Sequence, residues 1–521
     1  MLEVVWFKRD LRIDDHQPLV EAARRGPVLP LYIIEPELIG APDYDALHWD
    51  FIRSSLVELD RALGSLGQPL VVRHGPAVDV LAALHAERGI RRLWSHEETG
   101  NALSYARDRA VGAWCRRAGV AWQEIPSHGV VRRLRSRDGW AGHWERRMQK
   151  PPVAAPAALP PAGDGQPANL PTASELGLGH YSRRGTVQSG GSRAAAATLS
   201  SFLAVRGRDY RFAMSAPGSA HEACSRLSSH LAYGTISLRS VVHGTREARA
   251  KAIERAWQQS LASFERRLHW HCHFMQKLES EPAIEFACFN RSAEALRGPP
   301  DSSRLAAFLA GQTGYPFIDA CMRSLHEHGW INFRMRAMLT SFAAYDLWLD
   351  WRSFRDPLAR SFQDYEPGIH YSQLQMQSGT TGINTPRLYN PLKQALDHDP
   401  DGSFVRRYVP ELQSVPLAYL HTPWMMDAGL QQRCGVRLGD SYPQRVVRHE
   451  HRVAEIRAAL SELRARPSHR ADAARVYDRH GSRLGAGRRA VSARARRLAG
   501  ADATAPQPAR ERGPQTGFDF E

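Results

Sequence analysis

The stretch from Thr313 to Trp351 reads TGYPFIDACMRSLHEHGWINFRMRAMLTSFAAYDLWLDW. Apolar side chains recur at helical spacing on both sides of Gly329, which predicts two buried helices joined by a turn at this glycine. Arg323, Arg334 and Arg336 interrupt the apolar pattern. A buried guanidinium needs an anion or several acceptors to offset its desolvation. An arginine at a helix edge can instead extend its head to solvent, and the pattern alone leaves both interpretations open.

Toward the N-terminus, short apolar runs alternate with amphipathic segments. The apolar runs predict strands at residues 2–7, 28–36, 69–75, 90–98 and 120–126. The amphipathic segments predict helices at residues 18–25, 47–65, 77–87 and 103–117. Strand–helix alternation of this kind is typical of a doubly wound parallel sheet. No GxGxxG motif follows the first strand, so the sequence does not support an ordinary NAD site.

Composition divides the chain into further parts. Residues 136–198 are rich in Pro, Ala and Gly, which predicts a linker between domains. Helical periodicity dominates residues 199–440, and a basic helical segment follows at 441–480. The Arg-rich composition of residues 481–521 predicts a disordered tail. We therefore expect an α/β domain with a doubly wound parallel sheet at residues 1–135 and an all-α C-terminal domain.

The overall composition bounds the location and the partners. Hydrophobic residues make up 43% of the chain and charged residues 24%, as in a soluble globular protein. No apolar run is long enough to span a membrane, and charges near the N-terminus disfavour a secretory signal, so we expect a cytoplasmic protein. The scattered cysteines predict no disulfide framework and no metal site. The net charge of +15 favours a nucleic-acid partner, although part of it lies in the tail.

The central stretch resembles the flavin-binding core of the photolyase/cryptochrome family, TGYPxxDAxMRxLxxxGWxxxRxRxxxxSFxxxDLxxDWR. The segment VVWFKRDLRIDDHQPL near the N-terminus is similar to the family's opening, with His16 in place of an asparagine. The resemblance covers about residues 2–425. It implies an FAD cofactor in the helical domain, with Trp330, Arg334 and Arg336 among its contacts.

The segment CSRLSSHLAYGTIS at residues 224–237 resembles the family segment that holds the FAD phosphates. Hydroxyl and backbone N–H groups at the start of a helix suit a pyrophosphate without a glycine-rich loop. An ordinary helix N-cap would explain the same serine and leaves that alternative open. The resemblance assigns the cofactor contacts to Tyr210, Ser225, Leu227 and Ser228.

The segment RRLHWHCHFMQKL at residues 266–278 aligns with the family's lesion-binding helix. The resemblance places Trp270 at the lesion-stacking tryptophan and His271 beside the flavin. Arg267 stands where dimer photolyases keep a glutamate, and a guanidinium cannot accept a hydrogen bond from thymine as a carboxylate does. The type of lesion therefore stays open, and Trp270 as a plain core residue is the alternative. Histidines two residues apart point to different sides of a helix, so no metal site is predicted.

The segment FQDYEPGIHYSQLQMQSG at residues 362–379 is only distantly similar to the family's DGDxAxNNGGWQW. The resemblance implies that Asp364 faces the flavin and pairs with Arg336. A helix cap or a surface acid is the alternative for Asp364.

The family's electron-transfer chain of tryptophans is only partly present. Trp351 matches its middle member, whereas the flavin-proximal tryptophan is missing. Tyr371, Trp348 and Trp330 are candidates to replace it, and the sequence does not choose among them.

The segment TGINTPRLYNPLKQALDHDPDGSFVRRYVPEL at residues 381–412 is similar to a family segment near the duplex-facing rim. The resemblance implies phosphate contacts by Arg387, Lys393, Arg406 and Arg407. An ordinary solvated face explains the last two equally well.

The resemblance implies light-driven DNA repair, in which an electron passes from excited reduced FAD to a damaged pyrimidine pair swung out of the duplex. A cryptochrome-type photoreceptor without repair activity, signalling to an unknown partner, is the alternative. A flavin-free DNA-binding protein is a third. The resemblance also implies an antenna chromophore in the α/β domain. Ser104 stands where folate-using relatives have a glutamate, so folate is not expected. We expect a monomer that acts on damaged DNA without membrane association.

Overall fold

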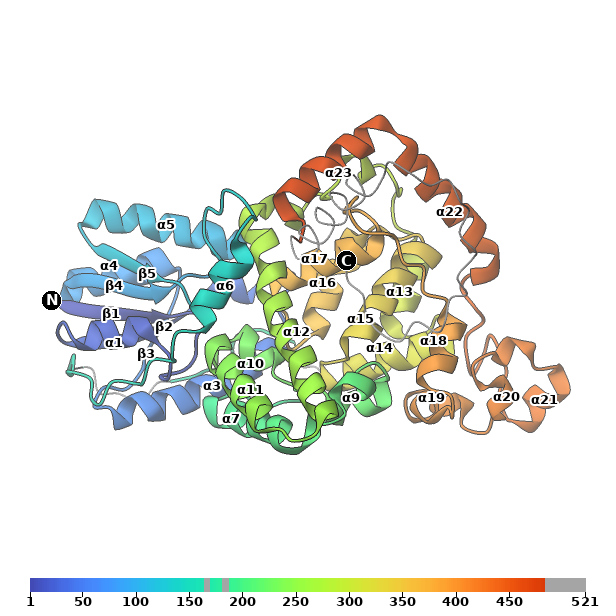
Figure 1. Cartoon of the computed structure of the whole chain (residues 1–521), viewed down its shortest axis with the longest axis horizontal. Helices are drawn as coiled ribbons and strands as arrows, with labels where there is room; N and C mark the ends of the chain where they lie inside the picture. The colour runs from blue at the N-terminus through green and yellow to red at the C-terminus, as the bar shows by residue number, and fades with distance from the viewer. Residues whose placement is uncertain (164–168, 180–186, 483–521) are drawn as a thin grey trace, which may run out of the picture.

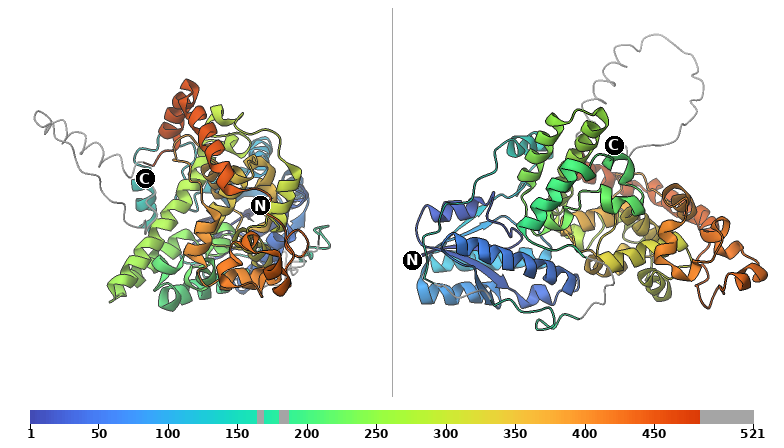
Figure 2. Two further views of the ribbon diagram at one scale, coloured as in Figure 1. Left: turned by 90° about the vertical axis from the view of Figure 1, so that its right-hand side faces the viewer. Right: turned by 90° about the horizontal axis from the view of Figure 1, so that it is seen from below.

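The computed structural model describes residues 1–163, 169–179 and 187–482 (Figure 1). The predicted disordered tail lies outside the described residues beyond residue 482. An α/β domain stands beside a larger helical domain (Figures 1 and 2). Helix α6 (Trp140–Met148) packs against residues of the helical domain, and the chain then returns to the sheet near Leu159. Within the described residues, no helix combines the length and apolar character that a bilayer crossing requires.

The α/β domain is built on a five-stranded sheet in the order β3-β2-β1-β4-β5, with every pair parallel. Its strands are β1 (Leu2–Phe7), β2 (Val28–Ile34), β3 (Val71–His74), β4 (Ile90–His96) and β5 (Ala121–Ile125). Its main helices are α1 (Gln17–Ala23), α3 (Ala46–Ser65), α4 (Ala77–Arg88) and α5 (Ala102–Ala118). The predicted doubly wound parallel sheet is confirmed.

Both faces of the sheet are covered because side chains alternate along each strand. Val5 and Phe7 pack with α1 and α3, whereas Val4 and Trp6 pack with α4 and α5. The strand order reverses between β1 and β4, and in open α/β sheets a crevice forms at the carboxyl ends of such strands. These ends face the helical domain (Figure 1).

The described part of residues 136–198, predicted as a linker, is packed on the protein. It contains α6 and the start of α7 (Ser192–Ser201). The segment near Leu159 lies beside the start of β2, where Val28 N donates to Pro160 O at 2.9 Å. Leu159 is buried. Composition predicted a linker here and missed both the helix α6 and the packing.

The two buried helices predicted around Gly329 are confirmed as α14 (Pro316–His328) and α15 (Phe333–Ser341). Gly329 has φ 64°, which glycine adopts without the penalty that other residues incur. Helix α17 (Pro367–Ser378) packs against α15, and α12 (Arg255–Ser280) and α16 (Trp351–Ser361) pack in turn against α17 (Figure 1).

Further helices complete the two domains. They are α2 (Pro36–Ile39), α8 (Tyr210–Ala213), α9 (Pro217–Ala223), α10 (Ser228–Ala232), α11 (Leu238–Lys251), α13 (Ser302–Ala310), α18 (Pro391–His398), α19 (Ser403–Tyr408), α20 (Leu417–Leu420) and α21 (Ala428–Arg433).

The predicted basic helical segment forms two helices, α22 (His449–Ala465) and α23 (Pro467–His480), which lie over one face of the helical domain (Figure 1). His480 is buried, and its Nε2 lies 2.7 Å from Glu281 Oε2. Asn290 Nδ2 donates to the carbonyl oxygen of His469 at 3.0 Å. These contacts hold α23 against the domain, and Ile456 and Leu460 of α22 pack in a buried cluster with Tyr345.

Candidate functional site

A cavity of about 280 Å³ lies in the helical domain between α12, α15 and the segment that leads into α17. We call it the flavin cavity because the sequence predicts the cofactor there. Most of the predicted site residues line it: Tyr210, Ser225, Ser228, Arg267, Trp270, His271, Trp330, Arg334, Arg336 and Asp364. Leu227 does not line it and packs instead in a buried cluster with Tyr210.

An arginine–carboxylate pair stands in the wall of the flavin cavity. Arg336 Nη2 donates to Asp364 Oδ2 at 2.8 Å, and Arg336 Nε donates to the carbonyl oxygen of Ile331 at 2.8 Å. The predicted pairing of Asp364 with Arg336 is therefore present in the structure. Asp364 Oδ1 is buried and has no hydrogen-bond partner among the described residues. The carboxylate thus keeps one acceptor for a ligand.

Several other buried polar atoms around the flavin cavity have no partner within the described part of the chain. They are Arg226 Nη1, Ser228 Oγ, His271 Nδ1, Glu366 Oε1 and Gln373 Nε2. Leaving a buried polar group unpaired costs about 1–3 kcal/mol, so a cluster of them around one cavity indicates a bound polar ligand. Aromatic walls from Trp270, Phe274 and Trp330 complete the lining. A flat aromatic ring joined to a phosphate chain, as in FAD, fits this combination.

Arg226 is a site residue that sequence reasoning missed. It has φ 60°, a conformation that arginine rarely adopts, and its guanidinium lies 3.9 Å from the centroid of the Trp330 ring. Burial lowers the pKa of Arg226 to about 10, although Asp364 opposes the shift. A desolvated cation with an unpaired N–H needs an anion. Its position between Ser225 and Leu227, inside the phosphate-binding motif, was the available signal.

The N-cap alternative for Ser225 is not what the structure shows. Helix α10 begins at Ser228 after Leu227, and no side chain caps its first turn. Within the described part of the chain, Ser225 Oγ accepts from Leu227 N at 3.4 Å. Both serine side chains line the flavin cavity instead.

His271 of α12 points to a different side from His269 and His273, which lie four residues apart on one face and both pack against Trp140. His269 packs against Trp140, with ring centroids 5.0 Å apart, and His273 contacts Trp270 at 5.0 Å. His271 lines the flavin cavity. Burial lowers the pKa of His271 to about 4, so its imidazole is neutral at pH 7 and presents an acceptor or a donor there.

Trp270 and Arg267 lie on the same wall of the flavin cavity as His271. Trp270 is half-buried, and its ring is tilted over Phe274 with centroids 5.5 Å apart. The guanidinium of Arg267 lies 5.8 Å from the Phe333 ring. Both side chains therefore belong to the lining of the flavin cavity.

Arg323 serves a structural role away from the cavity. Its Nη1 donates to Glu411 Oε2 at 2.8 Å, and its Nε donates to the carbonyl oxygen of Gly311 at 3.0 Å. Of the three arginines in the central stretch, only Arg334 and Arg336 line the flavin cavity.

The residues predicted at the DNA rim differ in their surroundings. Arg387, Lys393 and Arg407 are exposed, and Lys393 Nζ pairs with Asp397 Oδ1 at 3.1 Å. Arg387 lies close enough to Arg334 for its charge to lower the pKa of Arg334, after the larger effect of burial. Arg406 instead donates to the carbonyl oxygens of Gln413 and Val415, which ties it to its own loop.

The predicted electron-transfer residues differ in their distance from the cavity, and only Trp330 of the four lines it. Trp351 and Tyr371 are buried in the core of the helical domain and do not line the cavity. Tyr371 Oη lies 2.9 Å from Tyr365 Oη, and Tyr365 does line it. Trp330 also lines it, whereas Trp348 contacts Arg297 near the C-terminal helices.

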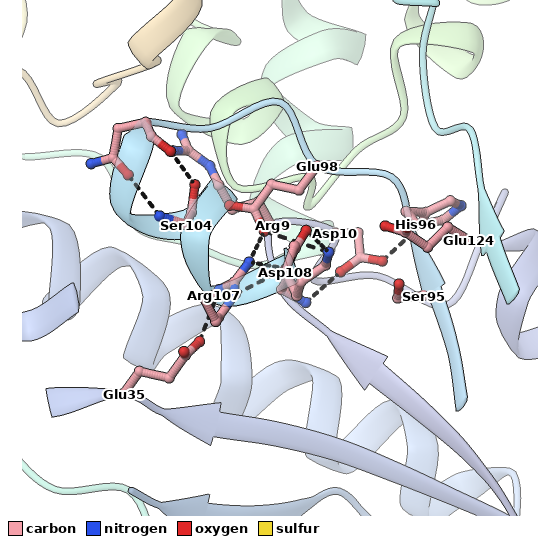
Figure 3. Close-up of polar contacts among 12 residues, drawn as sticks. Arg9, Asp10, Glu35, Ser95, His96, Glu98, Ser104, Arg107, Asp108 and Glu124 are labelled. Atoms are coloured by element: carbon pink, nitrogen blue, oxygen red, sulfur yellow. Dashed lines mark hydrogen bonds and ion pairs between the residues drawn. The ribbon is translucent and has the colours of Figure 1, made fainter. Parts of the chain in front are cut away.

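A second cavity, of about 120 Å³, lies at the carboxyl ends of β1, β2 and β4, where the two domains meet. Ser104 lines it, as do aromatic residues that include Trp6, Tyr32, Tyr44, Trp49 and Tyr365. Arg107 also lines this cavity and forms ion pairs with Glu35 at 2.8 Å and with Glu98 at 2.6 Å (Figure 3). A flat chromophore would find aromatic walls and buried charges here.

Asp10, His16 and His96 form the group closest to metal-ligand spacing among the described residues. Asp10 Oδ2 lies 2.9 Å from His16 Nε2 and 2.7 Å from His96 Nδ1. Since Leu19 N donates to His16 Nδ1 at 3.1 Å, the Nε2 atom carries the proton and donates to Asp10. Hydrogen bonds thus account for the cluster, which joins the ends of β1 and β4 to the start of α1.

Two family models match the chain. One, described as DNA photolyase, matches residues 3–139, and the other, the FAD binding domain of DNA photolyase, matches residues 264–462. The deoxyribodipyrimidine photo-lyase of Halobacterium salinarum is 28% identical over 493 residues, which cover 89% of this chain and 99% of that protein. Cryptochrome DASH of Gloeobacter violaceus is 28% identical and is covered over 92% of its length, against 85% of this chain. The crystal structure of a class III photolyase from Agrobacterium tumefaciens superimposes with a TM-score of 0.78 at 25% identity, covering 89% of this chain and 98% of that one.

Proposed function

The chain belongs to the DNA photolyase/cryptochrome family, and we propose that it is a deoxyribodipyrimidine photo-lyase type of enzyme. In this proposal it repairs DNA by light-driven electron transfer from reduced FAD to a flipped-out pyrimidine photoproduct. The observation that carries the proposal is the set of buried, unpaired polar atoms around the flavin cavity, beside Trp270 and Arg267. When bound, reduced FAD supplies the light-excited electron donor.

We assign the phosphate end of the cofactor to Arg226, Ser225 and Ser228. Arg226 brings a desolvated cation, and the serines bring hydroxyl donors. Tyr210 and Trp330 belong to the same contact set. Asp364 offers the oxygen that has no partner among the described residues as an acceptor for ring N–H groups, and the hydrogen bond from Arg336 orients that carboxylate.

The lesion end of the site is assigned to Trp270 and Arg267. Trp270 supplies an aromatic face on which an extruded base can stack. Arg267 donates only, so it suits carbonyl oxygens of a damaged base rather than its N–H groups. Extrusion costs a few kcal/mol and least for a base already weakened by damage, which favours lesions over intact pairs.

The duplex side is assigned to the exposed cations Arg387, Lys393 and Arg407. Phosphate contacts of this kind position the protein on the duplex without reading its sequence. The hydrogen bonds of Arg406 to Gln413 and Val415 support a structural role for that residue.

The remaining assignments concern electron supply and light collection. We propose that Trp351 and Tyr371 belong to the route by which electrons reach the cofactor. A second chromophore, not folate, would bind the second cavity. We further propose a cytoplasmic monomer with an α/β domain at residues 1–135 and a cofactor domain at residues 199–440.

Illumination of the purified, reduced protein with damaged DNA tests this proposal. Cyclobutane dimers and six-four products are scored separately in synthetic duplexes, with a dark sample as control. We expect loss of one lesion type in the light. Loss of neither lesion, together with rapid flavin photoreduction, would support the photoreceptor function and contradict repair.

A further inference from the structure

Tyr365 stands in the wall between the two cavities. It lies just before α17 and is a lining residue of both the flavin cavity and the second cavity. Its side chain is buried. Its hydroxyl donates to Asp43 Oδ2 at 2.6 Å, across the boundary between the helical domain and the α/β domain. Among the predicted electron-transfer residues, Trp351 and Tyr371 have no such place on the cavity wall.

The hydrogen bonds around Tyr365 share one donor-to-acceptor direction, toward Asp43. Asp43 Oδ2 accepts from Tyr365 and from Asn101 Nδ2, at 3.0 Å, so it acts as an acceptor. A phenol has one hydrogen, and Tyr365 places its own on Asp43. Tyr371, whose oxygen lies 2.9 Å from that of Tyr365, must therefore be the donor between the two phenols. The chain of bonds is Tyr371 to Tyr365 to Asp43.

This arrangement matters for one-electron chemistry because both phenols are buried. Burial raises the pKa of Tyr365 well above the usual value, and the charge of Tyr371 and of Asp43 raises it further. Neither phenol is a phenolate at neutral pH, so an electron leaves easily only if the proton can leave as well. A base in hydrogen-bond contact provides that path without bulk water.

We infer that Tyr365 is the immediate electron donor to the light-excited oxidised flavin and that Asp43 accepts its phenolic proton. This inference rests on the proposed function and gives that site its source of reduced cofactor. One electron passes from Tyr365 to the flavin, the O–H bond of Tyr365 breaks, and a new O–H bond forms on Asp43 Oδ2. Tyr371 then passes a hydrogen atom to the oxygen of Tyr365. The radical left on Tyr371 is reduced by an external thiol.

The other aromatic residues near the flavin cavity are less suited than Tyr365 to be the immediate electron donor. Trp330 lines the flavin cavity, but the Arg226 guanidinium lies 3.9 Å from its ring centroid and disfavours removal of an electron. Trp351 is fully buried and separated from the cavity by its lining residues. Tyr365 combines contact with the cavity and a bonded proton acceptor.

Blue-light photoreduction of the oxidised holoprotein tests the inference. Without a positioned proton acceptor, proton-coupled steps slow by about tenfold or more. We therefore expect Tyr365→Phe and Asp43→Asn each to lose about tenfold in the initial rate of photoreduction, and wild type to be slower in heavy water. Electron paramagnetic resonance should show a tyrosyl radical in the wild type, and its spectrum should narrow when the tyrosines are ring-deuterated. Tyr345→Phe is the matched control, since the buried Tyr345 hydroxyl has no hydrogen-bond partner in the described structure.

An unchanged photoreduction rate in Tyr365→Phe with full flavin content would overturn the inference, as would an indole radical in the wild type. The proposed repair function is tested separately, on a different sample. Wild-type protein reduced chemically with dithionite needs no electron from Tyr365, so its failure to repair either lesion would refute repair and leave the tyrosine result standing.

Discussion

At the scale of single residues, the flavin cavity is defined by groups whose hydrogen-bonding capacity the protein itself does not use. Asp364 keeps one oxygen unpaired, and Arg226 keeps one Nη unpaired while its backbone holds an uncommon conformation. Unpaired buried polar groups and uncommon backbone conformations persist in a folded protein where a bound ligand compensates for their free-energy cost. Asp364 and Arg336 followed from the resemblance of one motif. Arg226 and Glu366 could not be predicted in this way. They are recognised as site residues because they are buried and carry atoms without hydrogen-bond partners among the described residues, and a sequence shows neither property.

The role of Asp364 predicts weaker cofactor binding when it is removed. In Asp364→Ala, Arg336 loses its ion pair and the cofactor loses an acceptor, which together cost at least about 1.4 kcal/mol, or tenfold in affinity. Titration of FAD into the apoprotein measures this change. Asp397→Ala removes the acid of an exposed Asp–Lys pair and should leave FAD affinity unchanged. Equal affinity in wild type and Asp364→Ala would show the assignment to be wrong.

Glu366 predicts a dependence of stability on pH. Burial raises its pKa to about 7, although Arg9 opposes the shift. An unfolded glutamate titrates near about 4.3, so between these values the folded chain holds a proton that the unfolded chain has released. The free energy of unfolding therefore falls as pH rises through this window and levels off above the folded pKa.

The variant Glu366→Gln stays neutral at every pH and escapes this loss. Its melting temperature relative to wild type should rise from about pH 5 to about pH 8 and then stay constant. Thermal unfolding at matched flavin content measures the difference. A difference that does not change with pH would contradict the raised pKa.

At the scale of elements, periodicity predicted the strands and helices of the α/β domain and the pair α14–α15 closely. Each of these segments buries one regular stripe or an unbroken apolar run, so its own sequence carries the signal. The packing of residues 136–198 was harder to predict from the sequence. Their packing along the sheet depends on long-range contacts such as Val28 N to Pro160 O, which leave no local pattern.

The turn at Gly329 predicts a measurable cost for a side chain there. Gly329 has φ 64°, and an added Cβ would lie 2.9 Å from Leu47 Cδ2 of α3. We expect Gly329→Ala to lower the free energy of unfolding by about 1 kcal/mol or more. Gly64→Ala is the matched control, because Gly64 lies exposed within α3 and an added Cβ there meets no atom within 4 Å.

That control should be stabilising by about 0.5–1 kcal/mol, since alanine favours a helix over glycine. Denaturant unfolding of both variants gives the two values. Equal effects of the two substitutions would mean that the backbone conformation at Gly329 carries no constraint.

At the scale of the whole molecule, the two domains meet around residues that are far apart in sequence. Asp43 of the α/β domain and Tyr365 of the helical domain are separated by 322 positions, yet their side chains share a hydrogen bond between the two cavities. No motif spans such a distance, so the sequence indicated both cavities but not the wall between them. The net positive charge of the chain, by contrast, is a property of the whole molecule that composition shows directly.

The proposed DNA rim predicts a change in salt dependence. Each phosphate contact contributes about 0.9 to the slope of log affinity against log salt concentration. We expect Arg387→Ala and Arg407→Ala each to lower the slope for duplex DNA by roughly one, uniformly across sequences. Arg406→Ala, the neighbour tied to Gln413 and Val415, should leave the slope unchanged. A slope that falls equally in all three variants would contradict this placement of the rim.

The central claim is that the cavity beside Arg226 and Asp364 is built around FAD, and direct density for the cofactor tests it best. A crystal structure of the purified yellow protein should show the phosphates at Arg226, Ser225 and Ser228 and the ring near Asp364. An ordered FAD elsewhere, or a cavity that stays empty after soaking with saturating FAD, would contradict the account.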